Sequence, residues 1–279
     1  MTLLLHAGPM KTGSTAIQDL LACNTAVLAE RGIRFQWLRR DYLDHLEAVL
    51  ASHPPDDGEL LVVSHECLCR APSARLRTLL SALSCPIHAL LVARPLRELY
   101  PSLYLQNLKG HVMRCSSFEA FLEEQIERDR APELAQRGQL FCFAHLDAVL
   151  REAGCDVHWV RYSRSDLLRQ VVFFMAQLAG QSIDLDDLHP APAPQGANPR
   201  RSLDHAVADA ARTINRHCRE GALSPDGRQQ LLGSLLDFSD QIRALRSGAD
   251  PFPALHREHL DALDRELNGR FWAEQTFVA

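Results

Sequence analysis

Lysine is nearly absent from this sequence of 279 residues, in which Lys11 and Lys109 stand against 28 arginines. Acidic side chains slightly outnumber basic ones, 35 against 30, and the formal net charge is −5. The chain therefore lacks the excess of positive charge that is typical of nucleic-acid-binding proteins. Aromatic residues make up only 6% and do not alternate with basic residues, as they do in grooves for single-stranded nucleic acid. We expect no nucleic-acid partner.

Long apolar runs are missing too. The longest, such as residues 87–93, are far shorter than the roughly 20 residues that a membrane-spanning helix needs. The first residues carry no basic segment and only three consecutive leucines, so the pattern predicts neither a signal peptide nor a transmembrane segment. We expect a cytoplasmic protein.

Sequence patterns for metal and hydrolase chemistry are weak. None of the eight cysteines forms a Cys-x-x-Cys pair, and we interpret them as reduced thiols, most of them in the core. The segment from His65 to Cys69 nearly matches the zinc-protease pattern His-Glu-x-x-His, but its last residue is cysteine and it starts at a strand end, which disfavours zinc. No Gly-x-Ser-x-Gly elbow supports a serine hydrolase.

Apolar runs and helical periodicity alternate along the first two thirds of the chain. Buried strands are predicted at residues 3–6, 60–63, 87–93 and 157–161, with a short one at 33–35. The first predicted helix begins at Ser14 or Thr15, continues through Leu28 and is stopped by Gly32. Further helices are predicted at residues 42–51, 74–83, 96–109, 118–128, 146–153 and 166–179. This alternation predicts an α/β fold, a parallel sheet with flanking helices and right-handed crossovers.

One Pro-rich stretch, residues 189–199, resembles a linker. It follows the α/β core at residues 1–188, and residues 200–279 show helical periodicity only. Helices this short need tertiary contacts, so we predict a helical C-terminal cap packed on the core, within a single domain of residues 1–279.

A glycine loop joins the first predicted strand to the first helix, with the sequence His-Ala-Gly-Pro-Met-Lys-Thr-Gly-Ser-Thr at residues 6–15. Loops at this place in α/β sheets bind phosphates, because helix N-termini present unpaired N–H groups and glycine allows close approach. Hydroxyls and one lysine add further donors. The loop predicts an anion site formed by Lys11, Thr12, Gly13, Ser14 and Thr15.

The order of residues in this loop differs from the Walker A loop of P-loop ATPases. Lys11 comes two residues before Gly13, not directly after a glycine, and no Walker-B aspartate ends the strands at 60–63 or 87–93. A nucleotide kinase or NTPase of P-loop type remains an alternative, as does a non-catalytic phospho-nucleotide-binding module.

The order Lys-Thr-Gly-Ser-Thr, after a strand ending in His-x-Gly, resembles the 5′-phosphosulfate loop of sulfotransferases that use 3′-phosphoadenosine 5′-phosphosulfate (PAPS). It is most similar to their bacterial single-domain branch. A second pattern matches: Arg94 ends the strand at 87–93 and Ser102 follows eight residues later, like the pair that binds the 3′-phosphate in that family. An arginine fork and a short hydroxyl suit a phosphate. Pro101 departs from the pattern, because proline removes a helical hydrogen bond.

The resemblance covers residues 3–110 and weakens beyond them. The Arg-Lys-Gly phosphate loop near the C-terminus of the family's cytosolic members is absent. Arg200 and Arg201, just after the linker, are candidate replacements, with surface charges at a helix start as the alternative.

The resemblance implies a P-loop-like sulfotransferase architecture and transfer of a sulfo group from PAPS to a hydroxyl or amine, leaving adenosine 3′,5′-bisphosphate (PAP). Lys11 then stabilises charge on the leaving oxygen. The base that takes the acceptor proton is Glu66, with His65 as the second choice, both just after the strand at 60–63. The scheme needs no metal. The acceptor is a glycan, a lipid-linked sugar or a small molecule, and the oligomeric state stays open.

Overall fold

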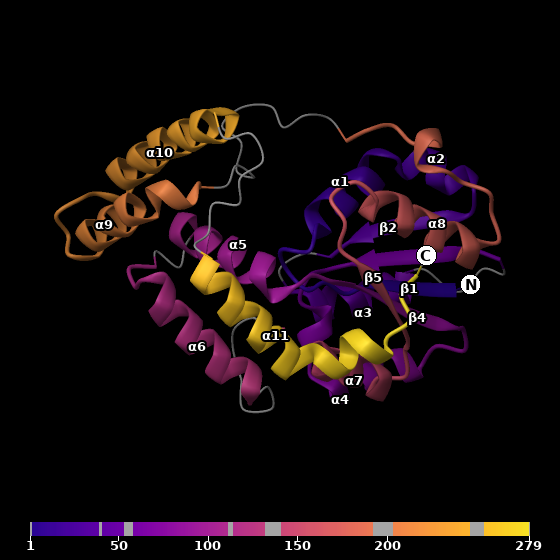
Figure 1. Ribbon diagram of the computed structural model, residues 1–279. Helices are drawn as coiled ribbons and strands as arrows, with labels where there is room; N and C mark the ends of the chain where they lie inside the picture. Colours follow the sequence, from indigo (N-terminus) through magenta and orange to yellow (C-terminus); the bar gives the residue numbers. More distant parts are fainter. Residues whose placement is uncertain are drawn as a thin grey trace. The chain divides into compact units, whose positions relative to one another are not determined.

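The computed structural model of the chain describes residues 2–38, 41–52, 58–110, 114–131, 141–191, 203–245 and 254–278. Within them, a parallel five-stranded sheet has the order β2-β3-β1-β4-β5 (Figure 1). The strands are β1 (Thr2–His6), β2 (Ile33–Trp37), β3 (Leu60–Ser64), β4 (Ile87–Ala93) and β5 (Asp156–Arg161). Each predicted strand is present, which confirms the predicted α/β fold with a parallel sheet and flanking helices.

Helices cover both faces of the sheet, which is why its strands are almost wholly apolar. The helices are α1 (Ser14–Cys23), α2 (Thr25–Glu30), α3 (Tyr42–Ser52), α4 (Ser73–Ser81), α5 (Leu96–Lys109), α6 (Phe118–Arg130), α7 (Phe143–Glu152), α8 (Leu167–Ala179), α9 (Ala208–Arg219), α10 (Pro225–Leu245) and α11 (Ala254–Glu274). One face packs against α1, α2 and α8, with Leu4, Val62 and Leu90 in its core (Figure 1). On the other face, the fully buried Trp159 contacts Phe143 of α7.

The helix predicted to begin at Ser14 or Thr15 is broken into α1 and α2 at Asn24. The Asn24 side chain donates to the Leu20 carbonyl at 2.8 Å and also exchanges hydrogen bonds with the backbone of His189, each at 2.8 Å. A buried amide that bonds backbone groups in this way competes with helix continuation. By contrast, α5 continues through Pro101.

Most of the cysteines lie outside the core, so the interpretation of them as mostly core thiols is wrong. All eight are within the described residues, and none forms a disulfide. Cys69 and Cys155 are buried, Cys23 is exposed, and the other five are half-buried. The positions of the cysteines in the sequence do not indicate which of them are buried.

The chain divides into two compact units, each built from separate stretches of sequence. The first holds the sheet and comprises residues 1–94, 131–192 and 267–279. The second comprises residues 95–130 and 193–266, so it combines α5 and α6 with α9, α10 and most of α11. The predicted division into residues 1–188, 189–199 and 200–279 runs along the chain, whereas these units are discontinuous. That the whole is one sulfotransferase domain stays a prediction.

Polar side chains hold the second unit together at the end of α5. Arg228 is only 8% exposed, and its guanidinium donates to the Gly110 carbonyl at 3.0 Å and to Asn215 Oδ1 at 2.8 Å. Asn215 in turn donates to the Leu108 carbonyl at 2.9 Å. These bonds satisfy carbonyl groups that the end of a helix leaves without partners.

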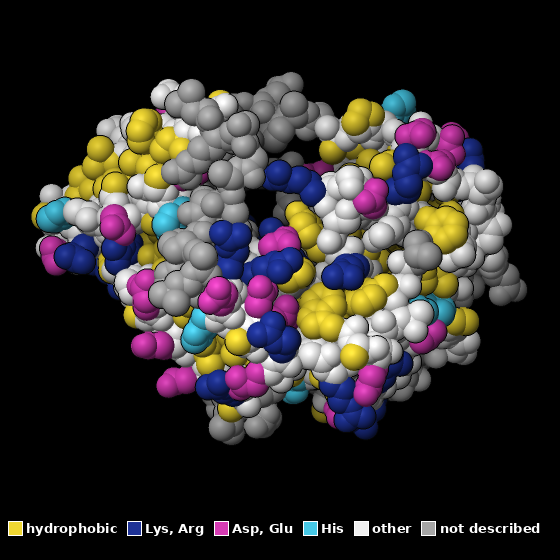
Figure 2. Space-filling view, in the orientation of Figure 1, with side chains coloured by type: hydrophobic (Ala, Val, Ile, Leu, Met, Phe, Trp, Pro, Cys, Tyr) yellow, Lys and Arg dark blue, Asp and Glu magenta, His cyan; other side chains and the backbone are white. Residues whose placement is uncertain are grey.

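No helix in the described ranges is long and apolar enough to cross a membrane. On the face shown in Figure 2, the Lys and Arg side chains of the described residues occur in small groups beside acidic ones. Proteins that bind the phosphates of a nucleic acid typically present one continuous basic surface. That no nucleic acid binds this chain stays an expectation.

Candidate functional site

The loop between β1 and α1 turns through three residues with left-handed backbone. Gly8 has φ of 90°, Lys11 of 66° and Gly13 of 92°. A lysine rarely adopts positive φ, and such positions persist only where the surroundings hold them. Gly13 forms the N-cap of α1, so its turn directs the chain into the helix.

Both glycines allow contacts that a side chain would block. A Cβ on Gly8 would lie 2.4 Å from the carbonyl oxygen of Glu66, and one on Gly13 would lie 2.3 Å from Cδ2 of Leu167. The loop therefore packs directly against the turn after β3 and the start of α8. The predicted base residue and the predicted anion loop are neighbours at the carboxyl edge of the sheet.

The N–H groups at the start of α1 form a candidate anion site. Ala16 and Ile17 bond back to the Gly13 carbonyl, so the N–H groups of Ser14 and Thr15 precede the first intrahelical bonds. The positive end of the helix dipole adds to them. Thr15 is exposed. Backbone N–H groups, a hydroxyl and a lysine make a donor set that suits a phosphate or sulfate.

Two hydroxyls of the predicted site point into the loop itself. Thr12 Oγ1 donates to the Pro9 carbonyl at 2.5 Å, and Ser14 Oγ donates to the same oxygen at 3.3 Å. Both residues are at most 1% exposed. In this structure, the side chains of Thr12 and Ser14 shape the loop.

Glu66 lies in the field of Lys11. Burial raises the pKa of the Glu66 carboxyl, while the charges of Lys11 and Arg70 act in the opposite direction. The net shift is upward, so this carboxylate is a stronger base than one on the surface. Glu66 and His65 follow the last residue of β3, Ser64, and lie in a turn rather than on an extended strand.

His65 is held by two contacts that restrict its chemistry. Its ring stacks on Tyr42 with centroids 4.7 Å apart, and its Nδ1 accepts a hydrogen bond from the Cys67 N–H at 3.1 Å. Burial and the charge of Arg70 lower the pKa of His65, which favours the neutral ring. A neutral imidazole whose Nδ1 accepts a bond carries its proton on Nε2 and has no second lone pair for a substrate proton.

Arg94 contacts the loop as well. Its Nη1 donates to the Lys11 carbonyl at 2.7 Å, and its guanidinium lies 4.3 Å from the centre of the Tyr162 ring. The Tyr162 N–H donates to the Ala93 carbonyl at 2.8 Å. Sequence analysis did not identify Tyr162 as a partner of this arginine. The position of Tyr162 in the sequence could have indicated this contact, because Tyr162 directly follows β5 and Arg94 directly follows the neighbouring strand β4.

Ser102, the predicted partner of Arg94, lies in α5 and is half-buried. Arg94 is the last residue of its stretch of the first unit, and Ser102 belongs to the second unit. Their joint action on one phosphate stays a prediction. Arg200 and Arg201 lie outside the described residues.

A buried polar group beneath the loop escaped sequence analysis. His6 Nδ1 forms a hydrogen bond with Ser64 Oγ at 2.7 Å, and Gln18 Nε2 donates to the same hydroxyl at 2.9 Å. Burial lowers the pKa of His6 to about 4, so the ring is neutral at physiological pH. These contacts tie the end of β1 to β3 and α1 directly under the glycine loop.

Comparison with known proteins gives limited similarity. No protein-family model matches the chain, and no curated protein matches it. Among solved structures, the chain is similar to a retinol dehydratase in complex with androsterone and the inactive cofactor PAP, with 15% sequence identity and a TM-score of 0.43. That similarity covers 96% of this chain and 80% of the other.

Proposed function

We propose that this protein is a sulfotransferase that moves a sulfo group from PAPS to a hydroxyl or amine acceptor. The observation that carries the proposal is the arrangement of Lys11, Glu66 and Arg94 around one glycine loop. Glu66 packs on the loop through Gly8 and interacts with Lys11, and Arg94 bonds to the loop backbone. In the proposal, one carboxylate base and two cations would line the anion site.

The donor set fits a ligand with several negative charges. The N–H groups at the start of α1 and the Lys11 ammonium would hold the 5′ end, as in other helix N-termini that bind phosphate. A guanidinium has five donors, so Arg94 can bind the Lys11 carbonyl and a phosphate together. With Ser102, it would hold the 3′-phosphate. PAPS, when bound, supplies the sulfo group, which passes to the acceptor as its bond to the 5′-phosphate oxygen breaks.

Glu66 is the proposed base. It takes the proton of the acceptor hydroxyl or amine as the acceptor atom bonds to sulfur. Lys11 stabilises the negative charge that develops on the departing phosphate oxygen. A positioned base contributes about 10²–10⁴ in rate. His65 is the weaker candidate for the base, because its Nδ1 lone pair already accepts a hydrogen bond from the Cys67 N–H and is not available for a substrate proton.

Two alternatives predict different ligands. A P-loop-type kinase or NTPase would bind ATP with Mg²⁺, and Glu66 is the acid beside the loop that such a metal would need. A non-catalytic module would bind PAP without turnover.

The test is transfer of radiolabelled sulfate from PAPS to a panel of glycans, lipid-linked sugars and small metabolites, with calorimetric titration of PAP and of ATP with Mg²⁺. The proposal predicts PAP binding and transfer to at least one acceptor class. ATP binding that requires Mg²⁺, without PAP binding, would support the kinase alternative and contradict the proposal. PAP binding with no transfer across the panel would support the binding module.

A further inference from the structure

Three metal-ligating side chains meet at the end of the sheet opposite the glycine loop. His88 lies near the start of β4, and Asp156 and His158 lie at the start of β5. The strand rise of about 3.3 Å per residue places His88 about 20 Å along β4 from Arg94. This group is therefore remote from the proposed sulfo-transfer site, for which no metal was predicted.

The register of the two strands explains why the three side chains converge. His88 is directly paired with Asp156, and Leu90 is paired with His158. Side chains two residues apart along a strand share a face, so all three lie on the face that packs against α8. The ring of His158 confirms this placement, since its centroid is 4.6 Å from that of Phe174 in α8.

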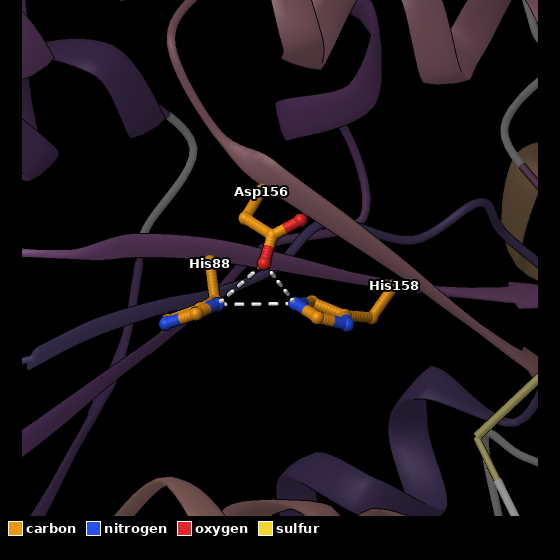
Figure 3. Close-up of side chains that lie close together, drawn as sticks. All are labelled: His88, Asp156 and His158. Carbon is orange, nitrogen blue, oxygen red and sulfur yellow. Dashed lines mark hydrogen bonds and ion pairs between the residues drawn. The ribbon is translucent and has the colours of Figure 1, made fainter.

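One atom from each side chain points to a common centre (Figure 3). His88 Nδ1 is 3.0 Å from His158 Nε2, and Asp156 Oδ2 is 3.5 Å and 3.1 Å from these nitrogens. Ligands bonded at about 2.0–2.1 Å to a tetrahedral zinc ion are about 3.3–3.4 Å apart. The observed triangle has nearly these dimensions, so an ion above it would bond all three atoms and keep one position open.

Two cavities adjoin the cluster. His88 and Asp156 line a cavity of about 530 Å³, and His158 lines another of about 390 Å³. The Asp156 carboxylate is the anionic ligand. The nearby cation Arg151 bonds to Asp147 at 2.5 Å, which offsets its repulsion of a bound metal.

We infer that His88, Asp156 and His158 form a binding site for a divalent transition-metal ion such as Zn²⁺. Two imidazoles and one carboxylate are the ligands that such ions prefer, whereas Mg²⁺ and Ca²⁺ favour sites made only of oxygen atoms. The ion would join the amino ends of β4 and β5 and stabilise the sheet from the edge remote from the loop.

The test is binding of Zn²⁺ to the full chain after treatment with a chelator, measured by equilibrium dialysis and calorimetry. We expect one ion per chain at this site and a rise in melting temperature of about 5 °C at saturating Zn²⁺. Mg²⁺ should produce no rise. Co²⁺ should give visible ligand-field bands without a thiolate charge-transfer band, which excludes binding by the cysteines.

The double variant His88→Gln, His158→Gln should lower Zn²⁺ affinity by at least 100-fold, and Asp156→Asn should lower it by at least 10-fold. His145→Gln changes a histidine of the same unit outside the cluster, and it should bind as the original chain does. Circular dichroism without metal checks that each variant folds. Unchanged Zn²⁺ binding in the double variant, or a thiolate band with Co²⁺, would overturn the inference. Zn²⁺ binding is measured without any sulfate-transfer assay. Failure of the metal-site inference is therefore distinguishable from failure of the proposed function.

Discussion

At the scale of single residues, the proposed chemistry depends most on Lys11. Its backbone has a left-handed conformation, and its carbonyl accepts a hydrogen bond from the Arg94 guanidinium. Its positive charge acts to lower the pKa of the Glu66 carboxyl. A lysine whose backbone is fixed at this point of the loop brings its charge to the place where negative charge would develop during transfer.

Lys11→Ala should lower the turnover number by about 10²–10³ while weakening PAP binding much less, because the lysine acts on charge that develops during transfer. Steady-state kinetics and PAP calorimetry measure the two effects. Lys109→Ala, which changes the other lysine of the chain, is the control and should leave turnover near that of the original protein. A loss of PAP binding as large as the loss of turnover would contradict this role.

Glu66→Gln should lower the turnover number by about 10²–10⁴, whereas His65→Gln should have a small effect. The base must be ionised, and the pKa of Glu66 is raised, so activity should rise with pH through a range above that of an exposed glutamate. The variant should lose this acidic limb in pH–rate profiles. A limb that persists in Glu66→Gln but disappears in His65→Gln would reverse the assignment.

His6 makes stability depend on pH. Its pKa is about 4 in the folded chain, against 6.5 for a histidine in water, so protonation favours the unfolded chain. Stability is complete above pH 6.5 and falls by up to about 3 kcal/mol as the pH drops toward 4. Urea unfolding across this range should show a shallower fall for His6→Gln. Parallel curves for both proteins would show that His6 is not the group responsible.

At the scale of elements, the glycine loop is positioned by its contacts with α8 and with the turn after β3. Gly13 and Gly154 both have φ of 92°, but a Cβ on Gly13 would collide with Leu167 whereas one on Gly154 would meet nothing within 4 Å. Comparing substitutions at these two glycines therefore separates the cost of backbone strain, which both share, from the cost of the collision, which only Gly13 has.

Gly154→Ala should cost about 1 kcal/mol of unfolding free energy through strain alone, and Gly13→Ala should cost about 2–4 kcal/mol because the collision adds to it. Chemical denaturation measures both. In a double-mutant cycle, Gly13→Ala should cost less in the Leu167→Ala background than in the original chain, because the colliding side chain is gone. Equal costs at the two glycines would mean that the contact with α8 does not constrain the loop.

Sequence analysis was most successful where one element has one clear pattern. The strands at 60–63 and 87–93 are buried on both faces, so their apolar runs identified them directly. Asn24 broke the first helix because of bonds to His189, a residue 165 positions away, which no local pattern contains. Hydrophobic periodicity cannot predict a helix boundary that depends on a contact between residues so far apart in the sequence.

The candidate site was predictable to the extent that parallel strands end at one edge. The loop at residues 11–15, Glu66 and Arg94 each follow a strand, and the fold brings them together. The stacking of Arg94 on Tyr162 and the His88–His158 pair depend on the register between β4 and β5, which sequence does not specify.

At the scale of the whole molecule, the account requires one nucleotide to be held at both ends. The 5′ site and Arg94 belong to the unit that contains the sheet, and Ser102 belongs to the unit that contains α5. The account predicts that Arg94 and Ser102 both contribute to PAP binding, and that removal of the 3′-phosphate removes their contribution while the loop at residues 11–15 still binds the 5′ end.

The most direct test is calorimetric comparison of PAP with adenosine 5′-phosphate, for the original protein and for Arg94→Ala and Ser102→Ala. The account predicts that Arg94→Ala weakens PAP binding by about 10–100-fold and Ser102→Ala by about 10-fold. Binding of adenosine 5′-phosphate should be nearly unchanged in Ser102→Ala. In Arg94→Ala, which also loses the bond to the Lys11 carbonyl, it should fall much less than PAP binding does. Equal losses for the two nucleotides, or no preference of the original protein for PAP, would contradict the account.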